Sequence, residues 1–102
     1  MRLTAAIIIA LAGCAAPAAA ATVTVTIDDL DFTPAEVTAK VGDTIVWVNK
    51  DALAHTATVE GGWEVMIPPK TSADRIMQEP GTVDYVCRFH PNMKGRINVT
   101  SP

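Results

Sequence analysis

The sequence predicts an all-β sandwich of about seven to eight short strands, and three observations support this fold class. Apolar and polar residues alternate in several stretches, which is the pattern of a half-buried strand. Turn-forming residues interrupt this pattern about every 8–12 residues, as is typical of sandwiches. No helical period extends beyond the apolar start of the chain. With 102 residues and no internal repeat, the chain has room for one such domain.

The expected strands follow from alternation and from β-branched or aromatic content. In the first strand, the valines and the isoleucine face one way and the threonines the other. Pro34 places the second extended stretch near a sheet edge, because proline cannot donate to a central ladder. The expected strands are residues 22–28, 32–40 with a break after Pro34, 44–49, 55–59, 63–67, 73–77, 82–87 and 96–100.

The same alternation predicts which side chains are buried. Residues expected to face inward on the last two strands are Val83, Tyr85, Cys87, Ile97 and Val99. Trp47 is expected in the core, and we expect Met66 and Met77 to fill irregular space there.

Residues 1–21 are predicted to be an export signal that precedes a domain of residues 22–102. Arg2 gives the positive start, and the apolar run that follows is shorter than the ~20 residues that a spanning helix needs. Two processing routes fit: a lipobox that ends at Cys14, or ordinary A-x-A cleavage near Ala20. The lipobox is favoured because Cys14 has no other evident role, and it would anchor the protein to the membrane as a lipoprotein. Both routes predict a bacterial, periplasmic protein.

The charge of the chain excludes one class of partner. The formal net charge is −3, and it becomes about −4 once Arg2 is removed. Nucleic-acid binding needs a clustered basic face, so we expect no nucleic-acid partner. We expect the domain to be a monomer.

Metal-ligating residues gather near the end of the chain. Cys87, His90 and Met93 are spaced C-x-x-H-x-x-M after an expected strand. The other of the chain's two histidines, His55, lies upstream. Each residue alone has an ordinary structural explanation, such as a buried small cysteine or a core methionine. Together, two imidazoles, one thiolate and a weak axial thioether form the ligand set of a blue-copper site. Structural zinc is the main rival, but it wants four strong ligands and this set offers three.

The sequence around these residues resembles the cupredoxin family. The motif follows a G-x-x-x-Y-x-C strand that begins at Gly81, and the upstream half has the runs 42–44 (Gly-Asp-Thr) and 47–49 (Trp-Val-Asn) before His55. The ligand loop is as short as in the amicyanin branch of the family. The resemblance covers roughly residues 22–100. It departs at Ala54, where amicyanins have proline, and at residues 88–89, which are Arg-Phe.

This resemblance implies a Greek-key sandwich with one type 1 copper ion at one end, held by His55, Cys87, His90 and Met93. It implies an electron carrier that cycles between Cu(II) and Cu(I), and not an enzyme. A c-type cytochrome is the expected acceptor and an amine dehydrogenase a possible donor. The alternative is a periplasmic copper chaperone or buffer.

The resemblance also implies roles for residues near the ligands. Asn49 would tie the loop that carries His55 to the loop that carries Cys87, and the backbone N–H of Thr56 would donate to the sulfur. From composition we expect an apolar rim around His90, formed by Leu53, Pro68, Pro69 and Pro91. Asp51, Glu60 and Glu64 are expected to be a solvated acidic fringe.

Overall fold

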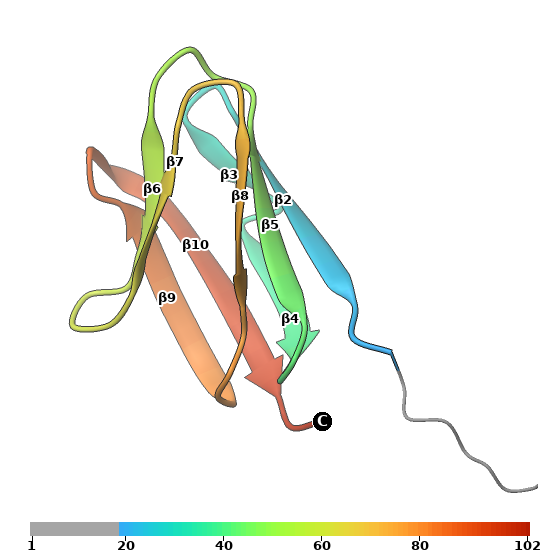
Figure 1. Cartoon of the computed structure of the whole chain (residues 1–102). Helices are drawn as coiled ribbons and strands as arrows, with labels where there is room; N and C mark the ends of the chain where they lie inside the picture. Colours follow the sequence, from blue (N-terminus) through green and yellow to red (C-terminus); the bar gives the residue numbers. More distant parts are fainter. Residues whose placement is uncertain (1–18) are drawn as a thin grey trace, which may run out of the picture.

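Nine strands form two packed sheets in residues 19–102, the part of the chain that the computed structural model describes (Figure 1). The described residues contain no helix, and the predicted all-β sandwich is confirmed. Of the predicted signal at residues 1–21, residues 1–18, which include Cys14, lie outside the described residues. The strands are β2 (Thr22–Asp28), β3 (Asp31–Thr33), β4 (Glu36–Lys40), β5 (Thr44–Asn49), β6 (His55–Thr58), β7 (Glu64–Ile67), β8 (Ser72–Ile76), β9 (Gly81–Cys87) and β10 (His90–Thr100).

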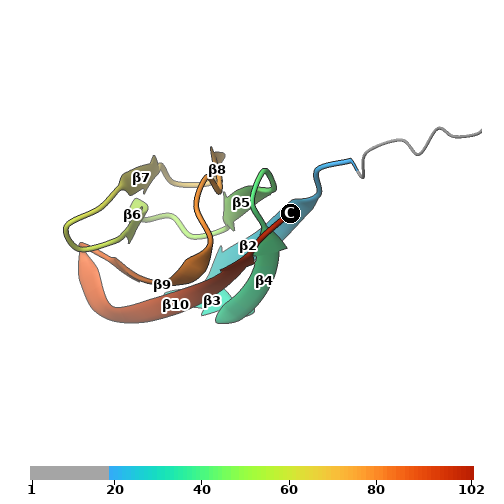
Figure 2. The ribbon, with the colours of Figure 1, turned by 90° about the horizontal axis from the view of Figure 1, so that it is seen from below.

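The chain crosses repeatedly between the two sheets. One sheet has the order β4-β10-β9-β6-β7 and the other the order β3-β2-β5-β8. The pairs β2–β5 and β4–β10 are parallel, and the other pairs are antiparallel. Seen from below, the sheets curve around a common interior (Figure 2). The β5–β6 and β7–β8 connections and the β9–β10 turn lie at the upper end in Figure 1, and the C-terminus lies at the lower end.

Two predicted strands differ from the structure. The second extended stretch is two strands in different sheets, because the chain crosses over around Pro34: β3 pairs with β2, whereas β4 pairs with β10. Both are edge strands, as Pro34 predicted. The last strand begins at His90 instead of Arg96. His90 already pairs with Cys87 across a two-residue turn, and a register shift follows between His90 and Lys94.

An aromatic cluster fills the space between the sheets. Trp47 and Tyr85 are buried, as predicted, and meet edge to face at 5.6 Å between ring centroids. Phe32 packs on the other side of Tyr85 at 4.8 Å. The indole N–H of Trp47 donates to the Tyr85 hydroxyl oxygen at 3.2 Å, so each of these two buried polar groups has a partner. Burial raises the pKa of Tyr85 to about 12.

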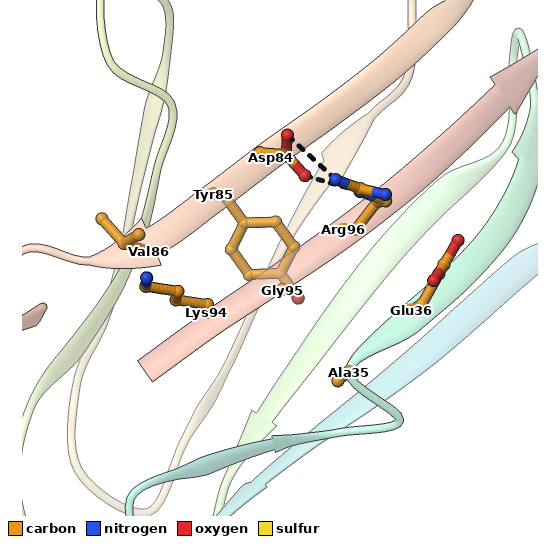
Figure 3. Close-up of a pocket in the computed structure, with 8 residues that line it drawn as sticks. All are labelled: Ala35, Glu36, Asp84, Tyr85, Val86, Lys94, Gly95 and Arg96. Carbon is orange, nitrogen blue, oxygen red and sulfur yellow. Dashed lines mark hydrogen bonds and ion pairs between the residues drawn. The ribbon is translucent and has the colours of Figure 1, made fainter. Parts of the chain in front are cut away.

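The Tyr85 ring lies over a glycine of the neighbouring strand. Gly95 pairs with Tyr85 in the β9–β10 ladder, and Figure 3 shows the ring beside it. A Cβ atom at Gly95 would lie 2.3 Å from Tyr85 Cζ, so a side chain there would force the ring to move. This contact between β9 and β10 lies two residues before Cys87.

Of the two methionines predicted to lie in the core, one is buried and one is exposed. Met77 is buried, as expected. Met66 is 47% exposed, so its prediction as a core residue is wrong. The inward residues of β7 are Val65 and Ile67, and Met66 therefore shares the outward face with Glu64.

Candidate metal centre

Three strand ends bring two imidazoles and a thiol together. His55 opens β6, Cys87 closes β9 and His90 opens β10. One donor atom from each residue lies within 4.8 Å of the others. Cys87 Sγ is 3.6 Å from Nδ1 of His55 and 3.6 Å from Nδ1 of His90. Residues far apart in sequence thus present one sulfur and two nitrogens to a common point, a donor set that suits a type 1 copper site.

Burial differs among the residues of this cluster. His55 and Cys87 are completely buried, whereas His90 is partly exposed. The His90 ring meets the His55 ring at 5.1 Å between centroids and an interplanar angle of 60°. Met93 is buried and lies on β10 within the register shift that follows His90. Only one of the two imidazoles therefore reaches the surface of the described domain.

The sulfur of Cys87 accepts a hydrogen bond from the main chain. Thr56 N donates to Cys87 Sγ at 3.4 Å, the bond that the family resemblance implied. Thr56 is completely buried, so water does not compete for this donor. A main-chain N–H dipole aimed at the sulfur would stabilise the negative charge of a metal-bound thiolate.

Asp51 fixes the orientation of the buried imidazole. Its Oδ2 lies 2.9 Å from His55 Nε2, and an ionised carboxylate can only accept a hydrogen bond. Nε2 therefore carries a proton, and in the neutral ring Nδ1, which faces Cys87, has a free lone pair. Metal-binding histidines are commonly held by a carboxylate in this way.

Asp51 was predicted to be a solvated residue, and that prediction is wrong. Its side chain is 14% exposed, and it also accepts bonds from the N–H groups of Asp29 at 2.7 Å and Leu30 at 3.0 Å. Burial alone would raise the pKa of Asp51, but the hydrogen bonds from Leu30, His55 and Asp29 hold that pKa below its ordinary 3.8. The β2–β3 turn, where Asp29 and Leu30 take positive φ of 54° and 64°, is thus connected to His55 through one carboxylate.

Asn49 supports the loop that contains Asp51. It is buried, and its Nδ2 donates to the carbonyls of Leu53 at 2.9 Å, Pro68 at 3.1 Å and Ile67 at 3.2 Å. Its Oδ1 accepts from Asp51 N at 2.9 Å. These bonds tie the His55 loop to the end of β7, whereas a tie to the Cys87 turn was expected. The Thr56 hydroxyl reaches that turn instead, by accepting from Arg88 N at 2.8 Å.

Glu64 is paired rather than simply solvated. Arg88 donates to it from Nε at 2.7 Å and from Nη2 at 2.9 Å. These bonds, with a further one from the Thr58 hydroxyl, lower the pKa of Glu64 to about 2. Sequence reasoning missed Asp51, the Thr56 hydroxyl and this pair. For Asp51 a signal existed: it is a carboxylate four residues before a candidate ligand histidine.

Exposed apolar side chains surround this end of the molecule. Leu53 is 51% exposed and Phe89 45% exposed, and the three prolines expected in the rim are exposed as well. A hollow of about 540 Å³ lies elsewhere, over β9, β10 and the start of β4 beside the Asp84–Arg96 ion pair, and none of the four predicted copper ligands lines it (Figure 3). Among residues 19–102 no helix has the length and apolar character that a membrane span requires.

Comparison with known proteins agrees with this arrangement. The family model for the cupredoxin-like domain matches residues 1–99. Amicyanin-alpha of Methylorubrum extorquens is 33% identical over 82 residues, which cover 74% of this chain and 69% of the relative. Amicyanin of Paracoccus denitrificans is 30% identical over 92 residues, covering 83% and 70%. The methylamine utilization protein MauL of M. extorquens is 32% identical over 104 residues, covering 97% and 91%.

Solved structures give the same result. A reduced amicyanin variant superposes with a TM-score of 0.70 at 30% identity, covering 76% of this chain and 81% of that one. The Cu(I) form of another amicyanin variant superposes with a TM-score of 0.70 at 29% identity, covering 80% and 85%. Sequence, fold and the position of the donor cluster thus point the same way, and the chain belongs to the cupredoxin-like family, with amicyanins among its relatives.

Proposed function

We propose that this protein is a blue-copper electron carrier that binds one copper ion through His55, Cys87, His90 and Met93. The observation that carries the proposal is the convergence of the Cys87 sulfur and two imidazole nitrogens within 4.8 Å. One thiolate and two imidazoles suit both oxidation states of copper, and a thioether is a weak axial ligand. When bound, copper would supply a one-electron Cu(II)/Cu(I) couple.

The protein residues would hold the donors in nearly one arrangement in both oxidation states. Cys87 and His55 belong to paired strands and are completely buried. Asp51 keeps His55 in the tautomer that offers Nδ1, and the Thr56 N–H donates to the Cys87 sulfur. A carrier built this way needs little rearrangement when the electron arrives.

The partly exposed His90 offers the shortest route from the centre to a partner. It lies at the surface beside exposed apolar side chains, which include Leu53, Phe89 and Pro91. Transient redox complexes use small interfaces, and a patch of this kind suits a brief encounter. Electron exchange through the edge of His90 therefore fits the described surface.

The relatives suggest where the protein works. Several are amicyanins, and one is a methylamine utilization protein that matches nearly the whole chain. An amine dehydrogenase as donor and a c-type cytochrome as acceptor are the partners that we propose. The predicted export signal, with processing at Cys14 or near Ala20, would place this exchange in the periplasm.

Copper loading tests the proposal directly. Cu(II) added to the purified, processed protein should give an intense blue colour and the narrow EPR hyperfine splitting of a copper–thiolate bond. Cys87→Ser should abolish both, and retained colour in that variant would contradict the ligand assignment. Reversible bleaching by a c-type cytochrome supports a carrier, whereas colourless transfer of Cu(I) to an acceptor without redox cycling would support a chaperone.

A further inference from the structure

We infer that a closed ring of hydrogen bonds, which begins and ends at Arg88, positions the sulfur of Cys87 by holding the β9–β10 turn against β6. The ring contains Arg88, Thr56, Thr58 and Glu64, and we call it the Arg88 ring. This inference deepens the proposed function and rests on it for its spectroscopic test.

The ring closes through short contacts. Arg88 N donates to Thr56 Oγ1 at 2.8 Å, the hydroxyls of Thr56 and Thr58 are 2.8 Å apart, and Thr58 Oγ1 donates to Glu64 Oε1 at 2.8 Å. The Arg88 guanidinium returns to the same carboxylate at 2.7 Å and 2.9 Å. One residue of the turn is therefore held by both its main chain and its side chain.

The direction of every bond in the ring is determined by Glu64. An ionised carboxylate only accepts, so Thr58 gives its single hydroxyl proton to Glu64. Thr58 must then accept from Thr56, whose own proton is thereby used. The Thr56 oxygen is left as an acceptor, and it takes the Arg88 N–H. Removing any one member leaves a neighbour without its partner.

The ring stands where the β-ladder is missing. The register of β6 with β9 contains one pair, Thr58 with Val86. Regular continuation of that antiparallel register would pair Thr56 with Arg88, but the contact there runs through the Thr56 side chain. Side-chain bonds thus replace ladder bonds beside the sulfur. Thr56 also donates its backbone N–H to Cys87 Sγ. Thr56 is therefore hydrogen-bonded both to the sulfur of Cys87 and to the main chain of Arg88.

A purely electrostatic role for Arg88 is the competing explanation. Arg88 and Glu64 carry opposite charges near the cluster, so neutralising either one changes the field at the sulfur with opposite sign. Thr58→Val distinguishes the two explanations. It removes the hydroxyl that closes the Arg88 ring, keeps the shape of the side chain and changes no charge. Thr58→Ser keeps a hydroxyl and should preserve the ring.

The matched control is the other bidentate pair of the same sheet. Arg96 donates to Asp84 at 2.7 Å and is 50% exposed, as Arg88 is, but it lies beside the hollow in Figure 3 and not beside the donors. Arg96→Gln therefore removes an equivalent ion pair without touching the Arg88 ring.

The first test uses copper-free protein and amide hydrogen exchange by NMR. Thr58→Val should speed exchange at Arg88 and Thr56 by about five- to tenfold, because the Thr56 hydroxyl that accepts the Arg88 N–H loses its own partner, a change worth about one hydrogen bond. Thr58→Ser and Arg96→Gln should leave both rates within about twofold of the parent. Unchanged rates in Thr58→Val would overturn the inference, whether or not the protein binds copper.

The second test uses copper-loaded protein, its EPR hyperfine splitting and its midpoint potential. Thr58→Val, Arg88→Gln and Glu64→Gln should all alter the splitting, and Arg88→Gln/Glu64→Gln together should not restore it. A potential that moves in opposite directions in the two single variants and returns in the double variant, with an unaltered splitting throughout, would show a charge effect only and overturn the inference. A parent protein that never turns blue would refute the proposed function, and the exchange rates would still decide on the ring.

Discussion

Replacing Asp51 by alanine is expected to destabilise the copper-free domain by about 2–4 kcal/mol and to release His55 from its tautomer. Alanine removes all three hydrogen bonds that the carboxylate accepts. The Nε2 proton of His55 is then buried without a partner, which costs about 1–3 kcal/mol. The N–H groups of Asp29 and Leu30 lie in an exposed turn where water can replace the carboxylate, so each costs only about 0.5 kcal/mol.

Asp51→Asn should cost about 1 kcal/mol, because it keeps the shape and most of the acceptors. The amide oxygen can take the place of Oδ2 and still accept from His55 and Leu30. The amide nitrogen then faces only the Asp29 N–H, where the turn is open to water. The pKa of Asp51 is lowered in the folded state, so the advantage of aspartate over asparagine is fully present above its unfolded pKa of about 4. That advantage is lost as the pH falls through the lower, folded pKa.

Urea unfolding and nitrogen NMR of the imidazole measure the two effects separately. The unfolding free energy should fall in the order parent, Asn variant, Ala variant, and the Nε2–H tautomer should become mixed only in the Ala variant. Asp31→Ala is the control, since Asp31 is an exposed aspartate of the neighbouring strand β3 and should change stability by less than about 0.5 kcal/mol. An Ala variant as stable as this control, or one that keeps a single tautomer, would refute the reasoning about Asp51.

Three further predictions concern the core and the loop. Tyr85 is the one tyrosine of the chain, so an ultraviolet titration should show its phenol ionising near pH 12 in the folded domain. The contribution of the neutral phenol to stability is complete below about pH 10 and is lost as the pH rises from 10 to 12. Ionisation near pH 10 without unfolding would contradict this prediction. Gly95→Ala should destabilise the domain by about 1–3 kcal/mol, because its Cβ would lie 2.3 Å from the Tyr85 ring, which is packed on several sides. Gly62→Ala is the control and should cost under about 1 kcal/mol, since its Cβ would meet the Val59 side chain at 3.0 Å. Equal losses of stability in thermal unfolding would contradict the argument. Asn49→Asp keeps the shape of the side chain but turns a carboxylate oxygen toward three carbonyl oxygens. It should therefore destabilise the domain by about 3 kcal/mol or more at neutral pH and by less in acid, where the carboxyl group is protonated. A loss of stability that does not depend on pH would contradict this prediction.

Alternation along the strands was sufficient to predict which side chains of β9 and β10 face inward next to the cluster. Val83, Tyr85 and Cys87 share one face of β9 because successive side chains point to opposite sides, and the structure has all three on the inward face. The same parity placed Ile97 and Val99 inward on β10. The convergence of Cys87 with the two histidines then requires only that a strand end and a short turn meet the start of another strand.

The prediction for Met66 failed because it used residue type and not the alternation of its strand. Met66 was taken for a core residue from its type alone, whereas β7 alternates with Val65 and Ile67 inward and Met66 outward. Hydrophobic character does not decide the face of a methionine, because its flexible chain tolerates exposure at edges as well as burial. Reading Val65 and Ile67 as the inward pair would have corrected this prediction.

The supporting hydrogen bonds could not be predicted because they depend on loop conformation. Asp51 reaches Asp29 and Leu30 only because the β2–β3 turn folds beside it, more than 20 positions away in sequence. Glu64 meets Arg88 across 24 positions for the same kind of reason. No periodicity links these residues, and their charges alone were equally compatible with a solvated surface.

The two sides of the cluster are built differently. This separates the geometry of the metal-binding atoms from the surface that a partner contacts. On the His55 side, the imidazole is fully buried and Asp51 and Asn49 leave it little freedom. On the His90 side, the imidazole sits at the surface at the end of a two-residue turn. Changes on the first side alter the geometry of the donors themselves, and so reach stability and metal binding together. Changes to exposed neighbours of His90, such as Phe89, alter what a partner touches while the buried donors keep their supports.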